Sequence, residues 1–95
     1  MTSKERAYLI KEANGLETIF QIGKNGIDRP LVEGVADALK ARELIKLRVQ
    51  DSCEYTVREA AEILSGRLAA ETVQVIGKRF VLYKRNRKTD RYGVR

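Results

Sequence analysis

Apolar positions along the chain change repeatedly from the spacing of helices to the alternation of strands, and this pattern predicts seven elements. The first is a helix whose apolar side is formed by Tyr8, Leu9 and Ile10. Ser3 can cap its start. Asn14-Gly15 is a strong stop signal, because glycine tolerates the left-handed conformation just past a helix end.

A strand and a second helix come next, joined by a short loop. The strand is expected over 16–22, with Thr18, Phe20 and Ile22 on one face and Ile19 on the other. Asp28 can cap the helix, and Pro30 suits its first turn, where no amide hydrogen is needed. The apolar stripe of the helix consists of Leu31, Val32, Val35, Ala36 and Leu39. Gly34 lies inside this helix at a cost of about 1 kcal/mol relative to alanine, so we expect close packing there.

Residues 44–49 alternate in a way that predicts a strand with two different faces. Ile45, Leu47 and Val49 share one face, whereas Lys46 and Arg48 point the other way. The strand therefore combines one buried face with one cationic face.

A third helix and a hairpin complete the predicted domain. Thr56 followed by Glu59 is a capping-box pattern, and Gly66 lies near the end of the helix behind it. Strands over 72–76 and 80–83 are joined by Gly77-Lys78, and so short a link predicts an antiparallel hairpin. The order α-β-α-β-α-β-β predicts an α/β fold, with three helices packed on a four-stranded mixed sheet and right-handed crossovers.

The chain of 95 residues is one domain by length, and its charge is concentrated at one end. The net charge is +6, yet residues 1–83 hold 13 basic and 12 acidic residues, whereas residues 84–95 hold six basic residues and one acidic residue. We therefore expect a single domain over 1–84 and a basic tail over 85–95. Such a segment favours a polyanionic partner, of which nucleic acid is the commonest. A merely solubilising or disordered tail is the alternative.

The composition argues against catalysis and metal binding. There is no histidine, so the usual base for a serine or cysteine nucleophile is missing. The single cysteine, Cys53, lies near Asp51 and Glu54, whose charges disfavour a thiolate, and it lacks the partners of a zinc site. We expect no enzyme activity, no cofactor and no metal. Because no apolar run resembles a membrane span or signal segment, we expect a cytoplasmic protein. We also expect a monomer.

The loop Gly23-Lys24-Asn25-Gly26 is the sharpest candidate for a binding site. It joins a strand to the start of a helix, and its glycines let backbone amides approach a phosphate closely. The helix start adds amides without internal partners and a dipole that favours an anion. Lys24 and Arg29 add positive charge, while Asp28 opposes it. The pattern is also that of a common turn, and it differs from a nucleoside-triphosphate loop.

Cationic side chains outside this loop extend the predicted contact surface. Lys46 and Arg48 can widen it, although a solvated outer face explains them equally well. The end of the domain and the tail contribute the candidates Lys84, Arg85, Arg87 and Lys88. Tyr92 can stack on an unpaired base, whereas Tyr83 is expected to be a packing residue.

Several short segments, taken in order, resemble the CRM domain, a name that stands for chloroplast RNA splicing and ribosome maturation. They are Gln21-Ile22-Gly23-Lys24-Asn25-Gly26-Ile27, Ala38-Leu39, Glu43-Leu44-Ile45-Lys46-Leu47, Val73-Gln74-Val75-Ile76-Gly77-Lys78 and Val81-Leu82-Tyr83-Lys84. The resemblance covers the chain from Ser3 to Arg85 and points to the bacterial single-domain, YhbY-like branch.

The resemblance implies a fold similar to the C-terminal domain of the third bacterial translation initiation factor. It also implies that the Gly-x-x-Gly loop contacts structured ribosomal RNA, by analogy with KH domains, and that the protein assists assembly of the large ribosomal subunit. Asp28 departs from the family pattern, where a small hydroxyl residue is expected, and the domain does not require the long basic tail. The alternative is a protein-interaction adaptor whose basic tail docks on an acidic partner.

Overall fold

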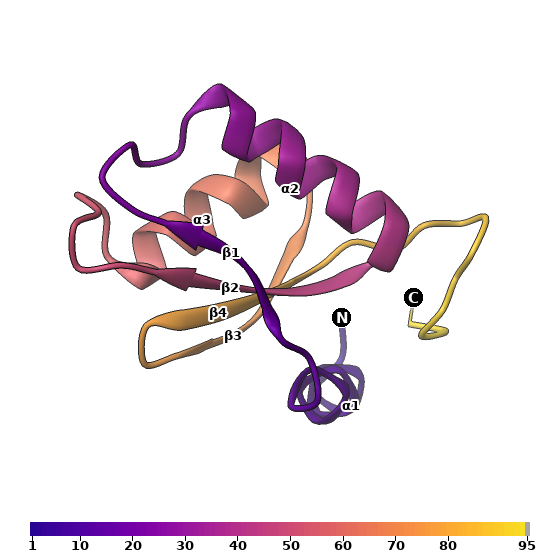
Figure 1. The fold of residues 1–95 in the computed structure, drawn as a ribbon. Coiled ribbons are helices and arrows are strands. Elements are labelled where there is room, and N and C mark those ends of the chain that lie inside the picture. The colour runs from indigo at the N-terminus through magenta and orange to yellow at the C-terminus, as the bar shows by residue number, and fades with distance from the viewer. Residues whose placement is uncertain (95) are drawn as a thin grey trace.

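The computed structural model describes residues 1–94 as a sheet with helices on both faces (Figure 1). The elements follow the order α1 (Ser3–Ala13), β1 (Thr18–Ile22), α2 (Arg29–Arg42), β2 (Leu44–Val49), α3 (Val57–Leu68), β3 (Glu71–Ile76) and β4 (Arg79–Tyr83). The predicted fold class and the predicted order of elements are therefore confirmed.

The four strands lie in the order β1-β2-β4-β3, and the sheet is mixed. β1 and β2 are parallel, because α2 carries the chain back to the end of the sheet from which β1 started. β4 is antiparallel to both β2 and β3. The predicted turn at Gly77-Lys78 closes the β3–β4 hairpin, and Gly77 takes a φ of 58°, which costs glycine little.

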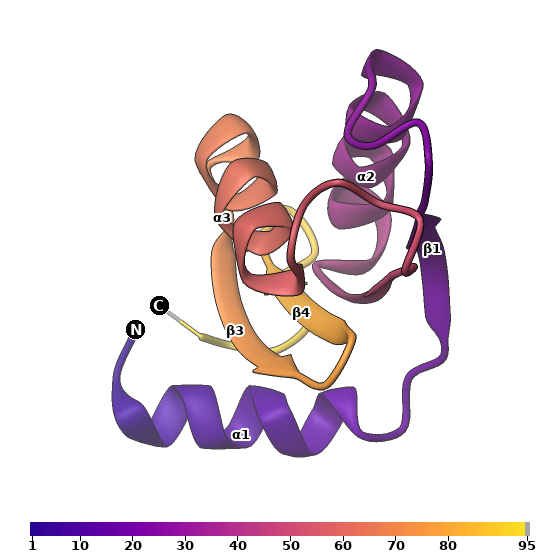
Figure 2. The same cartoon turned by 90° about the vertical axis from the view of Figure 1, so that its left-hand side faces the viewer.

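The helices cover the two faces of the sheet unequally, as Figure 2 shows. On one face, α2 and α3 bury the larger core, whose strand residues are Ile22, Ile45, Leu47, Val49, Phe80 and Leu82. On the other face, α1 closes a smaller cluster made of Leu9, Ala13, Leu44, Val73, Val81, Tyr83 and Val94. Part of this second face lies beyond the reach of α1 and remains available to other contacts.

Two helix starts follow the same capping rule. α3 begins with the predicted capping box, in which Thr56 and Glu59 exchange hydrogen bonds. α1 is capped by Thr2 and not by Ser3, because Thr2 forms the same reciprocal pair with Glu5. The prediction was therefore one residue off at the first helix.

β1 departs from the predicted strand in its start and in one side chain. It begins at Thr18, and its pairing with β2 shifts between Thr18 and Phe20. As a result Ile19 packs against the larger core together with Phe20, rather than on the opposite face. The close packing expected at Gly34 is confirmed, because a Cβ there would lie 3.1 Å from Phe20 Cε1.

Candidate nucleic-acid interface

The turn over 23–26 leaves β1 at the end of the sheet where β2 also ends. Gly26 N donates to Gly23 O at 2.9 Å, which closes a tight turn with Lys24 and Asn25 exposed at its tip. Gly26 has a φ of 65°, and a Cβ on Gly23 would clash with the Gln50 side chain. The left-handed backbone therefore favours glycine at position 26, whereas a larger residue at position 23 would require the exposed Gln50 side chain to move.

Two backbone amides at the tip of this turn are available to a ligand. Within residues 1–94, the amides of Lys24 and Asn25 donate to no protein group. An open pocket of about 480 Å³ borders them, and its wall includes Gln21, Gln50 and Leu31. Amides that point toward solvent beside a lysine form a competent site for a phosphate oxygen.

The first turn of α2 has fewer free amides for binding an anion than the sequence suggested. Pro30 has no N–H, and Leu31 N donates to Asp28 Oδ1 at 3.0 Å. Val32 N donates to Asp28 O at 3.0 Å. The bond from Val32 is the first bond of the helix itself, and Arg29 N donates to no group within residues 1–94. The helix start therefore offers an anion one unpartnered amide, fewer than the free amides of a typical helix start.

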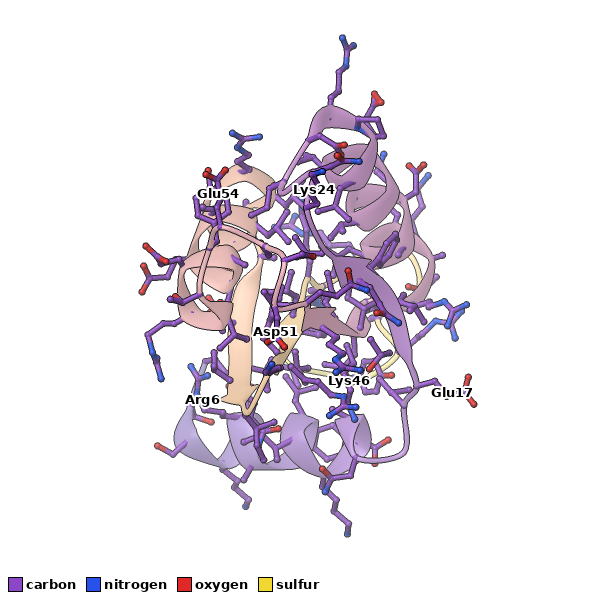
Figure 3. The ribbon with its side chains drawn as sticks, turned by 60° about the vertical axis from the view of Figure 1, so that its left-hand side comes forward. Arg6, Glu17, Lys24, Lys46, Asp51 and Glu54 are labelled. Atoms are coloured by element: carbon purple, nitrogen blue, oxygen red, sulfur yellow. The ribbon has the colours of Figure 1, made fainter. Side chains whose placement is uncertain are left out.

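Charges of both signs surround the turn. Figure 3 shows Lys24 and Glu54 at the same end of the molecule, on the loops that follow β1 and β2. A Cβ on Gly26 would lie 3.8 Å from Glu54 Oε1, so this carboxylate borders the turn. Arg29 pairs with Glu33 at 3.7 Å, whereas Lys24 forms no ion pair within the described residues. Lys24 is therefore the cation that the turn itself presents.

Lys46 and Arg48 lie on the face of the sheet that α1 covers only in part. They alternate with the core residues Ile45 and Leu47, which confirms a strand with two different faces. Figure 3 shows Lys46 between α1 and the end that carries Lys24. The pairing of β2 with β4 sets Arg48 opposite Arg79, so the uncovered part of this face is cationic.

The basic tail folds back on the domain. Lys84 N donates to the main-chain oxygen of Glu43 at 2.9 Å, and Asn86 Nδ2 donates to Lys40 O at 2.9 Å. The amides of Thr89 and Asp90 then donate to Asn86 O at 3.1 and 2.7 Å, which closes a turn over 86–90. The cationic segment is consequently a structured part of the surface.

The last described residues complete the cluster under α1. Val94 is buried there, and Tyr92 packs against it from the side. The Tyr92 ring meets Tyr8 and Tyr83 edge-on, with centroids 6.4 and 6.2 Å apart. Tyr92 therefore takes part in the packing of this cluster, a role that the sequence had suggested only for Tyr83.

Glu43 is the residue that holds the tail in place. Its side chain is 0% exposed, and its φ of 67° is uncommon for any residue except glycine. Oε1 accepts from Asn86 N at 3.2 Å, while Oε2 accepts from Thr89 Oγ1 at 2.6 Å and from Arg91 N at 2.9 Å. Burial by itself raises the pKa of Glu43, but these hydrogen bonds outweigh it and leave the pKa below 4.5. The carboxylate is therefore charged at neutral pH.

Sequence reasoning missed this role of Glu43. An acidic residue at a helix end, where a left-handed conformation would favour glycine, carries no signal of its own. Its partners lie 43 to 48 positions later in the chain, so no local pattern connects them.

Among residues 1–94, no group of three or more His, Cys, Asp or Glu side chains could hold a metal ion. In the same range, no helix is both long and apolar enough to cross a membrane. Cys53 is half-buried, and its Sγ accepts a hydrogen bond from Tyr55 N at 3.4 Å.

Comparison with known proteins shows the class to which this fold and surface belong. A model of the CRS1/YhbY (CRM) domain matches residues 1–84. The chain therefore belongs to the CRM-domain family, as the resemblance of its short segments had indicated.

Three bacterial proteins illustrate the similarity. The chain is 39% identical over 88 residues to the "Probable RNA-binding protein YqeI" of Bacillus subtilis, which covers 93% of this chain and 92% of the relative. It is 27% identical over 84 residues to an RNA-binding protein of Haemophilus influenzae, covering 88% and 85% of the two chains. The solution structure of a Staphylococcus aureus protein, described as a candidate RNA-binding protein, matches with a TM-score of 0.73 and 39% identity over 90% of both chains.

Proposed function

We propose that this protein binds structured RNA and gains most of its affinity from contacts with phosphates. One observation carries the proposal: the tip of the turn over 23–26 presents two amides without protein partners beside an unpaired lysine. The names of the relatives in the same family support RNA as the ligand. Phosphate contacts position a protein without reading sequence, so direct base recognition should be modest.

The proposed contact surface starts at the turn and extends over neighbouring cations. Arg29 can join Lys24, because an exposed pair such as Arg29–Glu33 is worth only about 0–1 kcal/mol and is readily exchanged for a phosphate. On the sheet and in the tail, the further contacts are Lys46, Arg48, Lys84, Arg85, Arg87 and Lys88. No step of this function requires a catalytic residue.

We infer further that the RNA is ribosomal and that the protein assists assembly of the large subunit, as the resemblance to single-domain CRM proteins implies. Sedimentation of a cell extract at low salt tests this inference. The protein should travel with precursors of the large subunit and leave them when the salt is raised. A protein that stays at the top of the gradient in both conditions would contradict the ribosomal role.

The turn is tested by replacing both of its tip residues with aspartate. Lys24→Asp with Asn25→Asp should weaken binding of a labelled ribosomal RNA fragment by about 100-fold or more, because each contact with a charged phosphate is worth about 1.5–3 kcal/mol. Both side chains are exposed, so the melting temperature should hardly move. Binding is measured by filter retention, and melting by circular dichroism.

A matched control separates the turn from general charge. Ser3→Asp with Lys4→Asp changes the net charge by the same amount on exposed positions of the first turn of α1, where acidic residues suit the helix dipole. The control should retain most of the affinity. Equal losses in the two double variants would show that the turn is not a contact site, and an absence of RNA binding by the unmodified chain would favour the adaptor function.

A further inference from the structure

A second cationic feature lies at the opposite end of α2 from the turn over 23–26. It is an open pocket of about 390 Å³ between the end of α2 and the folded tail. Its polar lining consists of Lys40, Lys84, Arg85, Asn86, Arg87 and Lys88, and no acidic residue lines it. We refer to it as the tail pocket.

The charges of the tail pocket are largely unneutralised by the protein. Arg85 pairs with Asp90 through two contacts of 3.2 and 3.3 Å. The other four cations form no ion pair within the described residues. Several like charges around one small space repel one another, so the folded pocket is best stabilised by an anion.

The protein keeps this segment ordered despite the repulsion. The buried carboxylate of Glu43 accepts hydrogen bonds from Asn86, Thr89 and Arg91. Asn86 and Thr89 flank the exposed cations Arg87 and Lys88. Asn86 Oδ1 also accepts from Lys88 N at 3.0 Å. A tail that acted only as a mobile cloud of charge would need none of these bonds. The arrangement is that of a preformed site.

We propose that the tail pocket is a second site for RNA phosphates, which Glu43 organises as a positioning residue. This inference rests on the proposed RNA-binding function. α2 has 14 residues, so its two ends, and with them the two sites, lie about 20 Å apart. Glu33 and Asp37 are exposed on the helix between them and repel a strand laid along it. The two sites therefore contact separate segments of a folded RNA rather than one extended strand.

Glu43→Gln distinguishes a preformed pocket from a charge cloud, because the two predict effects of opposite sign. The substitution keeps every cation and raises the net charge by one, so a charge cloud would bind RNA as well or better. A preformed pocket loses one of the two acceptor oxygens that order the tail, and RNA must then reorder the tail when it binds. We expect binding of a labelled RNA hairpin to weaken by about tenfold, because part of the binding energy is spent on reordering the tail. Unchanged or tighter binding would overturn the proposal.

A pair of double variants tests the pocket without touching Glu43. Arg87→Ala with Lys88→Ala removes two exposed cations of the tail pocket, and Lys4→Ala with Lys11→Ala removes two exposed cations from α1. The first pair should reduce the slope of log affinity against log salt by about 1.4–1.8, since each phosphate contact contributes about 0.7 in a single strand and about 0.9 in a duplex. The α1 pair should leave the slope nearly unchanged. Equal slopes for the two double variants would overturn the pocket as a site.

The outcomes keep the pocket separate from the turn. If the unmodified chain and the α1 pair bind the hairpin and only the Lys24/Asn25 variant loses binding, the proposed function stands and the tail pocket fails.

If Glu43→Gln does not fold, Thr89→Val takes its place, because it removes one donor to the carboxylate without changing charge. Deleting the tail would be uninformative, because Val94 and Tyr92 belong to the cluster under α1. The proposal would also be overturned if polyglutamate binds the tail pocket while the variants of the pocket leave RNA binding unchanged.

Discussion

Replacing Glu43 by glutamine should release the tail in the free protein while the rest of the domain remains folded. The carboxylate offers one oxygen to Asn86 N and the other to both Thr89 Oγ1 and Arg91 N. Glutamine has a single carbonyl oxygen. If that oxygen serves Thr89 and Arg91, the new amide group faces the N–H of Asn86, and two donors then confront each other in a buried place.

The size of the effect follows from these three bonds. A hydrogen bond to a charged group contributes about 1.5–3 kcal/mol and a neutral one about 0.5–1.5 kcal/mol. Two bonds therefore lose about 1 kcal/mol each and the third is lost outright, which gives about 3–5 kcal/mol for a tail that stays docked. The tail can detach locally, so the global free energy of unfolding should fall by less than this sum.

Amide hydrogen exchange followed by NMR measures the release directly. The amides of Asn86 and Arg91 should lose most of their protection in Glu43→Gln, whereas amides of β2 and β4 should keep theirs. Glu59→Gln is the matched control, because it removes the same charge from an exposed capping carboxylate far from the tail. Equal protection of Asn86 in all three proteins would refute the role of Glu43.

Acid should reproduce the effect of the substitution. Burial raises the pKa of Glu43, but its hydrogen bonds outweigh burial and lower the pKa below the ordinary value of 4.5. The carboxylate therefore contributes its full stabilisation above pH 4.5, and this contribution is lost as the pH falls through the lower pKa of the folded state. The tail of the unmodified protein should therefore lose protection below pH 4.5, while Glu43→Gln shows no such transition. If the tails of the unmodified protein and of Glu43→Gln respond identically to acid, this assignment is wrong.

Two glycines give further predictions of stability, each measured by urea denaturation. Gly26→Ala should destabilise the protein by about 1–2 kcal/mol, because its φ of 65° is left-handed, and a change of less than a few tenths would show that the turn relaxes without strain. Gly34→Ala should change stability by less than about 1 kcal/mol, because the gain in helix propensity is offset by contact with Phe20 at 3.1 Å. Gly34→Val should be clearly destabilising in comparison, and equal stabilities would refute the tight contact.

The fold was predictable from sequence because its signals are local. Periodicity located the helices and strands, Thr56 with Glu59 identified a helix start, and Gly77-Lys78 identified the hairpin. The one-residue error at the first cap arose because Thr2 and Ser3 are both competent caps, and only the pairing with Glu5 decides between them.

The candidate site was predictable only in part. The narrow turn and its exposed lysine follow from two glycines around Lys24 and Asn25. The start of α2 offers few free amides, because Pro30 has no N–H and the Asp28 side chain accepts from the amide of Leu31. The order of the tail could not be foreseen, because it depends on Glu43 and on partners in a different part of the sequence.

The cluster under α1 has a consequence for synthesis of the chain. It joins Leu9, near the start, to Val94, near the end, whereas the larger core is complete once Leu82 is in place. A ribosome delivers the N-terminus first, so α1 is made before any strand that it covers. The apolar side of α1 therefore lacks its partners in the sheet until the later strands have been translated. The cluster under α1 can therefore close only after Val94 has been made, later than the larger core.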